Sequence, residues 1–202
     1  SGEDVKSGEQ ILEEGTLLRP AHIGMLASIQ RSMVFVYQQP RVAVLSTGDE
    51  LLEIDEPWED GKIVNSNSYS LAALVAESGG LPIQLGIAKD RREELTAKIQ
   101  QGLGADLLLT SGGVSVGDYD LVKEMLNALG QMNFWKVAMR PGQPLAFGMI
   151  SEKPLFGLPG NPVSSMVSFE QFVRPSILKM CGYKDLFRPT LQAILREEIS
   201  KK

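Results

Sequence analysis

The hydrophobic positions of the chain follow two patterns, short apolar runs and stretches with helical spacing. Largely apolar runs predict buried strands at 42–45, 83–87, 106–110, 134–138, 145–150 and 155–158. Helical spacing predicts helices at 66–78, 93–103, 119–129 and from Val163 onward, with Pro175 forcing a kink or a break in the last one. This alternation is typical of a three-layer α/β/α sandwich with a mostly parallel sheet.

The two ends of the chain depart from this pattern. Near the N-terminus we expect a short strand at Leu17-Leu18 and a helix over 21–29, because Pro20 suits a first helical turn. Residues 190–199 alternate apolar and polar side chains, as a single strand does. A lone strand cannot form a domain, so we interpret 39–182 as the central domain and both ends as parts of flanking domains.

Three loops of small residues follow predicted strands: Ser46–Glu50, Ser111–Asp120 and Pro159–Pro162. The carboxyl ends of parallel strands meet at one edge of a sheet, so these loops predict one ligand site. Glycines let backbone N–H groups face a bound anion, although a tight turn or a helix cap explains each loop equally well in isolation. The candidate ligand contacts are Thr47, Gly48, Asp49, Ser111, Gly112, Gly113, Ser115, Pro159, Gly160, Asn161 and Pro162.

Carboxylates accompany these loops. Asp90 and Asp120 each follow a predicted strand, and two acids at adjacent strand ends can share a Mg²⁺ ion. Helix capping is the alternative for Asp90 and the favoured interpretation of Asp118. Glu50 follows the first central strand and is a candidate metal ligand or general base, or simply a solvated acid.

Two cations precede a proline-rich turn. Lys136 and Arg140 come just before Pro141-Gly142-Gln143-Pro144 and are candidates for neutralising an oxyanion or a pyrophosphate, with Pro141 and Gly142 beside the ligand. Solvated surface charges are the alternative. We interpret Asn65-Ser66-Asn67 as a helix start, His22 and Cys181 as structural, and Trp58 and Trp135 as packing residues.

Composition narrows the class of partner. The net charge of −5 argues against nucleic acid, because phosphate contacts need a basic surface. The single Cys181 cannot form an internal disulfide and fits a reducing compartment. No apolar run approaches the roughly 20 residues that cross a bilayer. We therefore expect a cytoplasmic protein without nucleic-acid or membrane partners.

Four ordered segments resemble the molybdopterin molybdenumtransferase family, the MoeA-type group that includes the E domain of gephyrin. They are Ser46–Leu51 (STGDEL), Ser111–Asp120 (SGGVSVGDYD), Phe134–Pro144 (FWKVAMRPGQP) and Leu158–Ser164 (LPGNPVS). The resemblance implies a MogA-like fold for 39–182. It makes 1–38 the end of a neighbouring extended α+β domain and 183–202 the start of a truncated C-terminal β domain.

The resemblance also implies a reaction, the insertion of molybdate into adenylylated molybdopterin with release of AMP in a metal-dependent step. It makes Glu50, Asp90, Asp120, Lys136 and Arg140 the catalytic candidates. The first three are the candidate ligands of Mg²⁺ or another divalent metal. It further implies a homodimer for the full-length protein and a MogA-type adenylyltransferase as pathway partner. This fragment alone is expected to bind without efficient catalysis.

Three residues depart from the family pattern. Arg140 and Gln143 stand where lysines are frequent, and Asn65 stands where aspartate is common.

Three other functions remain open: a molybdopterin adenylyltransferase, a CinA-like nucleotide pyrophosphatase, and a non-catalytic molybdopterin-binding scaffold. The GGVSVGDYD loop and the extensions at both ends disfavour the first. The absence of the GGLGPT loop typical of CinA disfavours the second, and the retained acids disfavour the third.

Overall fold

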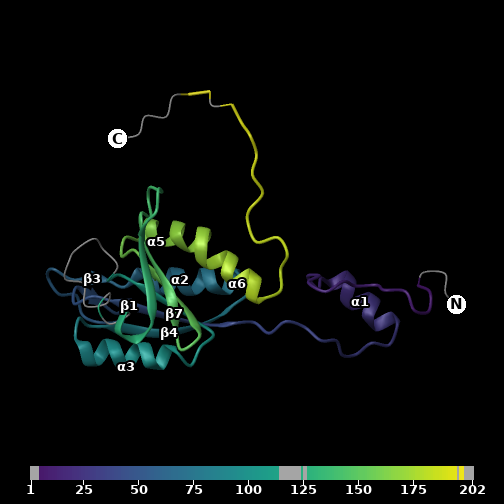
Figure 1. Cartoon of the computed structure of the whole chain (residues 1–202), viewed down its shortest axis with the longest axis horizontal. Coiled ribbons are helices and arrows are strands. Elements are labelled where there is room, and N and C mark those ends of the chain that lie inside the picture. Colours follow the sequence, from purple (N-terminus) through teal and green to yellow (C-terminus); the bar gives the residue numbers. More distant parts are fainter. Residues whose placement is uncertain (1–4, 114–123, 125–126, 195, 198–202) are drawn as a thin grey trace.

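The computed structural model describes residues 5–113, 124, 127–194 and 196–197. At its centre lies a six-stranded sheet in the order β4-β1-β5-β8-β7-β6 (Figure 1). The strands are β1 (Arg41–Thr47), β4 (Leu81–Ala88), β5 (Leu107–Ser111), β6 (Gln131–Lys136), β7 (Pro144–Ile150) and β8 (Lys153–Leu158). Strands β4, β1, β5 and β8 are parallel neighbours, whereas β7 runs antiparallel to both β8 and β6. The predicted mostly parallel sheet is confirmed.

Helices cover both faces of this sheet, which confirms the three layers. Figure 1 shows α3 on one side, and α2, α5 and α6 on the other. The helical segments are α2 (Ser66–Glu77), α3 (Arg92–Gly102), α5 (Pro162–Ser168), the π-helical turn η1 (Phe169–Val173) and α6 (Arg174–Met180). Strand β1 contributes side chains to the hydrophobic core on both faces of the sheet. Val42 and Val44 pack on the α2 side, while Ala43 and Leu45 pack on the α3 side.

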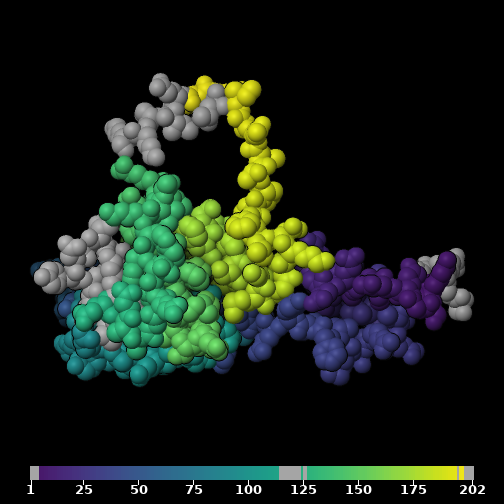
Figure 2. Space-filling view, in the orientation of Figure 1, coloured from purple at the N-terminus to yellow at the C-terminus, as the bar shows by residue number. Residues whose placement is uncertain are grey.

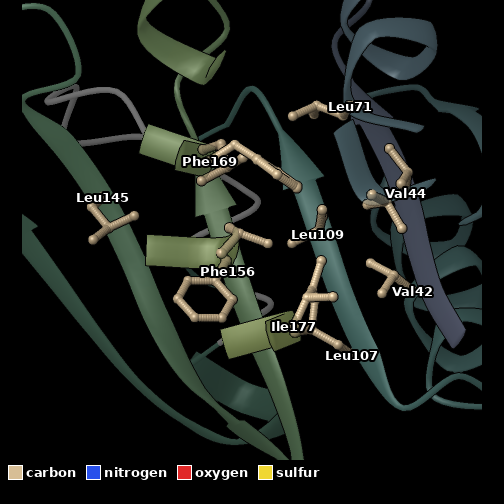
Figure 3. Packing of buried hydrophobic residues seen from close by; sticks show 12 residues of the cluster. Val42, Val44, Leu71, Leu107, Leu109, Leu145, Phe156, Phe169 and Ile177 are labelled. Atoms are coloured by element: carbon tan, nitrogen blue, oxygen red, sulfur yellow. The ribbon is translucent and has the colours of Figure 1, made fainter. Parts of the chain in front are cut away.

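The larger hydrophobic cluster holds α2 and the α5–α6 segment on the sheet (Figure 3). Phe169 and Ile177 lie over Leu109 and Leu107 of β5, and all four side chains are fully buried. Burying a side chain of this size stabilises a fold by about 1.5–3 kcal/mol. This packing fixes the start of α5, and with it the loop that follows β8.

The last helix is interrupted where Pro175 predicts. Proline has no N–H to donate to the carbonyl four residues earlier, and the π-helical turn Phe169–Val173 lies directly before it. Val163 and Met166 are exposed, because Ser165 and Ser168 face inward instead. The buried stripe runs through Ser165, Phe169 and Val173 at a spacing of four residues, which turns Val163 and Met166 to the surface.

The flanking segments contain less regular structure than the sequence predicts. Helix α1 (Pro20–Ser28) is confirmed, and so is the structural role of His22, whose Nδ1 accepts a hydrogen bond from the Arg19 N–H at 3.0 Å. Leu17-Leu18 form no strand, and neither do residues 190–194. The C-terminal residues, yellow in Figure 2, leave the body as extended chain, so Leu191 and Ile194 have no sheet to pack on and are exposed.

Other expectations have mixed outcomes. Trp58 and Trp135 are largely exposed, so the prediction that they are packing residues is wrong. A small parallel pair, β2 (Leu51–Leu52) with β3 (Ile63–Val64), was not predicted because two residues per strand leave no periodicity to read. The expected helix at 119–129 lies mostly outside the described residues, of which 124 and 127–129 are helical. No described helix is long and apolar enough to cross a membrane.

Candidate functional site

The carboxyl ends of five strands lie at one edge of the sheet. Parallel pairing places the ends of β4, β1, β5 and β8 there. Strand β6 joins them, because it is antiparallel to β7, which is antiparallel to β8. This carboxyl edge therefore carries the loops after β1, β4, β5 and β8, together with the loop from Val137 to Gln143 that connects β6 to β7.

One end of the carboxyl edge is an acid corner formed by Asp49, Glu50 and Asp90. The backbone N–H of Asp90 donates to Oδ1 of Asp49 at 3.1 Å, and Gly48 N–H donates to the carbonyl of Ala88 at 3.2 Å. Desolvation raises the pKa of Asp90, and the negative charges of Asp49 and Glu50 raise it further. The corner thus concentrates negative charge that a bound cation would neutralise.

Helix capping does not explain Asp90. Helix α3 begins at Arg92, and its N-cap is Arg91, which makes no side-chain cap hydrogen bond. Asp90 lies one residue before that position, so the capping alternative for this residue is wrong. Asn161, by contrast, does cap its helix, because its Oδ1 accepts a hydrogen bond from the Ser164 N–H at 3.1 Å.

The middle of the edge is built from glycine loops in close contact. Gly112 has a φ of +94°, and a Cβ at this position would lie 2.6 Å from the carbonyl oxygen of Thr47. Its N–H donates to the Leu158 carbonyl at 3.1 Å, which joins the β5 loop to the end of β8. Only glycine fits here without strain. The predicted Ser111-Gly112-Gly113 and Pro159-Gly160-Asn161-Pro162 loops therefore do come together.

Two asparagines near the start of α2 organise these loops, and sequence reasoning interpreted them only as a helix start. Ser46 Oγ donates to Oδ1 of Asn65 at 2.8 Å, and that oxygen also accepts from the Ser68 N–H at 3.3 Å. Asn67 Nδ2 donates to Ser111 Oγ at 2.7 Å and to the Gly160 carbonyl at 2.8 Å. The helix-start interpretation of Asn65 is confirmed. The sequence did hold one signal for Asn67. It lies two residues after the cap Asn65, inside the helix, so it cannot itself be the cap.

The other end of the edge is a cationic loop, residues 136–143. Lys136 is the last residue of β6, and both it and Arg140 are exposed. Residues 137–144 and Ser164 line a hollow of about 580 Å³. A Cβ on Gly142 would lie 2.9 Å from Ser168 Oγ, so the loop rests directly on the α5–η1 segment. Arg140, Pro141 and Gly142, three of the candidate site residues, thus line this hollow.

The two ends of the edge are well separated. Five strand spacings of about 4.8 Å separate β4 from β6, which is about 24 Å. Lys136 and Asp90 therefore cannot contact the same atom of a ligand. A molecule that touches both must be long and must lie across the glycine loops.

Two predicted site residues, Ser115 and Asp120, lie outside the described residues, and so does Asp118, the candidate helix cap. Among the residues that the structure describes, no group of three or more His, Cys, Asp or Glu side chains is arranged to hold a metal ion. A divalent ion at the acid corner would accordingly need further oxygen ligands beyond the described carboxylates.

The central part of the chain has recognisable relatives. Residues 43–179 match the family described as a probable molybdopterin binding domain. The chain belongs to this molybdopterin-binding domain family. The match begins in β1 and ends in α6, so it contains all of the sheet except the first two residues of β1, and every loop of the carboxyl edge.

Relatives of this molybdopterin-binding domain carry an enzyme name. The chain is 44% identical over 189 residues to the molybdopterin molybdenumtransferase of Haemophilus influenzae, covering 93% of this chain and 47% of that protein. It is 40% identical over 205 residues to that of Staphylococcus aureus strain COL, covering 99% and 48%. The chain thus spans about half the length of the curated relatives it matches.

Solved structures agree with this assignment. A molybdopterin biosynthesis MoeA protein from Pyrococcus horikoshii superposes with a TM-score of 0.81 at 32% identity, covering 90% of this chain and 46% of that one. CinA from Thermoplasma acidophilum has a TM-score of 0.54 at 16% identity, covering 69% of this chain and 98% of CinA. The second likeness shows a shared fold alone.

Proposed function

We propose that this chain binds adenylylated molybdopterin along the carboxyl edge and serves the insertion of molybdate with release of AMP. The observation that carries the proposal is the layout of that edge, with an acid corner at one end, a cationic loop at the other and packed glycine loops between them. A ligand that combines a nucleotide, a pyrophosphate and a pterin is long enough to contact both the acid corner and the cationic loop. The molybdenumtransferase names of the relatives support the same reaction.

The acid corner is proposed to hold a divalent ion such as Mg²⁺. Carboxylate oxygens are ligands that this ion takes, and the hydrogen bond of 3.1 Å from the Asp90 N–H to Asp49 Oδ1 brings two acids together there. Mg²⁺ binds through one or two protein carboxylates and completes its shell with phosphate oxygens and water. When bound, the ion would neutralise charge on the pyrophosphate. We propose Asp90, Glu50 and Asp120 as the residues that hold it.

The glycine loops are proposed to position the pyrophosphate between the two ends. Gly160 leaves room for a close approach, because a Cβ at this position would meet nothing nearer than Gly112 Cα at 3.8 Å. Lys136 and Arg140 then offset anionic charge at the pterin and molybdate end. Gln143 supplies no charge there, which weakens the field that an oxyanion meets.

The wider assembly follows from the same proposal. We propose that residues 39–182 are the ligand-binding domain, that the full-length protein is a homodimer, and that a MogA-type adenylyltransferase supplies the substrate. Cys181 is a free thiol, which supports a reducing, cytoplasmic setting.

Calorimetric titration of adenylylated molybdopterin into the 202-residue chain, with and without Mg²⁺, tests the function. We expect one binding event that Mg²⁺ strengthens and that Asp90→Asn weakens about tenfold or more, since a charge-assisted contact is worth about 1.5–3 kcal/mol. The matched control is Glu152→Gln, which removes an exposed acid from the β7–β8 turn at the opposite edge. Absence of binding by the wild-type chain, or equal weakening by both variants, contradicts the proposal.

A further inference from the structure

Asn67 joins two loops of the carboxyl edge that come from different strands. It is the second residue of α2, and it is 9% exposed. Its Nδ2 donates to Oγ of Ser111, the last residue of β5, at 2.7 Å. The same nitrogen donates to the carbonyl of Gly160, in the loop after β8, at 2.8 Å. One amide thereby spans both loops.

The chemistry of these contacts requires an amide. The Gly160 carbonyl can only accept, so the NH₂ group of Asn67 must face it, and both of its N–H bonds are used. An aspartate of the same shape has no donor and would bring a carboxylate oxygen against the carbonyl oxygen. A serine is too short to reach both partners.

Helix α2 does not need these bonds for its own stability. Leu71 and Val75 anchor it in the core with no exposed surface, and Asn65 caps its N-terminus. The two loops, however, touch each other closely, through the Gly112–Leu158 hydrogen bond of 3.1 Å. The bonds of Asn67 therefore act on the loops rather than on the helix.

We propose that Asn67 is a positioning residue, which holds the Ser111-Gly112 loop and the Gly160 loop at the separation that a bound ligand requires. The inference rests on the proposed function, because it takes these loops as the ones that receive the pyrophosphate. A distant mutation that displaces a group of a site by about 1 Å can lower the reaction rate by as much as 100-fold. Asn67 needs no contact with the ligand to have such an effect.

The test compares Asn67→Asp, which keeps the shape and loses both donors, with Ser78→Ala. Ser78 lies at the other end of α2, is also buried, and donates its Oγ hydrogen to the Leu74 carbonyl at 2.7 Å. Each variant removes side-chain hydrogen bonding from the same helix, but only the first faces the loops. Asn67→Gln keeps the amide on a longer stem and serves as the conservative variant.

Two measurements on the 202-residue chain separate the possible outcomes. Without ligand, hydrogen exchange of the amides at 111–113 and 158–161 is expected to be about tenfold faster in Asn67→Asp and unchanged in Ser78→Ala. With Mg²⁺, the dissociation constant for adenylylated molybdopterin is expected to rise about tenfold in Asn67→Asp, to stay within about twofold in Ser78→Ala, and to be intermediate in Asn67→Gln.

The outcomes distinguish the positioning role of Asn67 from the proposed function. Wild-type exchange rates or wild-type affinity in Asn67→Asp would overturn the positioning role. Equal loss of affinity in Asn67→Asp and Ser78→Ala would overturn it too, since general destabilisation would then suffice. Faster loop exchange in Asn67→Asp in a chain whose wild type binds nothing would support the loop-holding role and contradict the proposed function.

Discussion

The Asp90 backbone N–H donates to the Asp49 carboxylate at 3.1 Å, which ties together the ends of β4 and β1. This contact holds the two acids in one corner, where partial desolvation and the charge of Asp49 raise the pKa of Asp90. A raised carboxyl pKa means that the ionised group destabilises the fold at neutral pH. The protein keeps this unfavourable charge at the place where a cation is proposed to bind.

Asp90→Asn is therefore predicted to stabilise the chain while it weakens ligand binding. Removing the repelled charge should raise Tm at pH 7 by about 1–2 °C, a modest value because Asp90 is exposed and solvent screens it. The check is calorimetric unfolding of both proteins without ligand. A clear fall in Tm would mean that the carboxylate has a structural role.

Gly112 and Gly160 form a matched pair that separates folding from binding. Gly112→Ala is predicted to lower Tm by about 4–9 °C, because its Cβ would meet the Thr47 carbonyl in a left-handed conformation that costs about 2 kcal/mol or more. Gly160→Ala is predicted to fold normally and to weaken ligand binding, since its Cβ would make only an ordinary van der Waals contact, with Gly112 Cα at 3.8 Å. Thermal unfolding and titration of both variants check this. Equal Tm values for the two would contradict the packing described for the loops.

Much of this edge was predictable because strand ends can be located from sequence. The apolar runs predict the strands of the central sheet, and parallel pairing then brings their loops together without knowledge of any side chain. Asp90 and Gly112 were identified in this way. The place of Lys136 at the end of a strand, and of Arg140 in the loop after it, also followed from the apolar run that predicts this strand.

What could not be predicted depends on contacts between distant segments. Asn67 and Asn65 have the same side chain and lie two residues apart, yet one caps a helix and the other bridges two loops. The local sequence shows only that Asn67 comes after the cap, and it does not show which loops the Asn67 side chain contacts. The inward position of Ser165 and the exposure of Val163 likewise follow from how α5 packs on the sheet, which a pattern of apolar residues does not determine.

Gln143→Lys is predicted to strengthen binding of molybdate at the cationic loop. Gln143 is exposed, so a lysine fits there, and an added charge beside Arg140 should raise oxyanion affinity about three- to fivefold at low salt. The gain should shrink as ionic strength rises, because salt screens exposed charges. Titration of molybdate at two salt concentrations checks both parts. An affinity unchanged at low salt would place the oxyanion elsewhere.

Asp106 is predicted to stabilise the sheet in a pH-dependent manner at the edge opposite the site. Its Oδ2 accepts the Arg41 N–H at 2.8 Å, and this bond, with the Arg41 side chain and Lys153, lowers the pKa of Asp106. The folded pKa is depressed, so the stabilisation is complete above the unfolded value of about 3.9 and is lost as pH falls through the folded value.

Asp106→Asn should accordingly cost about 1 kcal/mol of unfolding free energy at pH 7. That difference from the wild type should shrink as pH falls below about 4. Urea unfolding of both proteins across this range measures it. A difference that stays constant with pH would show that the charge of Asp106 contributes nothing.

The central claim is that one ligand lies across the carboxyl edge from the acid corner to the cationic loop. Amide chemical-shift mapping of the isotopically labelled chain, titrated with adenylylated molybdopterin and Mg²⁺, tests it most directly. The account predicts that amides at 48–50, 89–91 and 138–143 shift together with one dissociation constant, while those of the β7–β8 turn at 151–152 do not move. Shifts confined to one end of the edge, or centred on that turn, would contradict it.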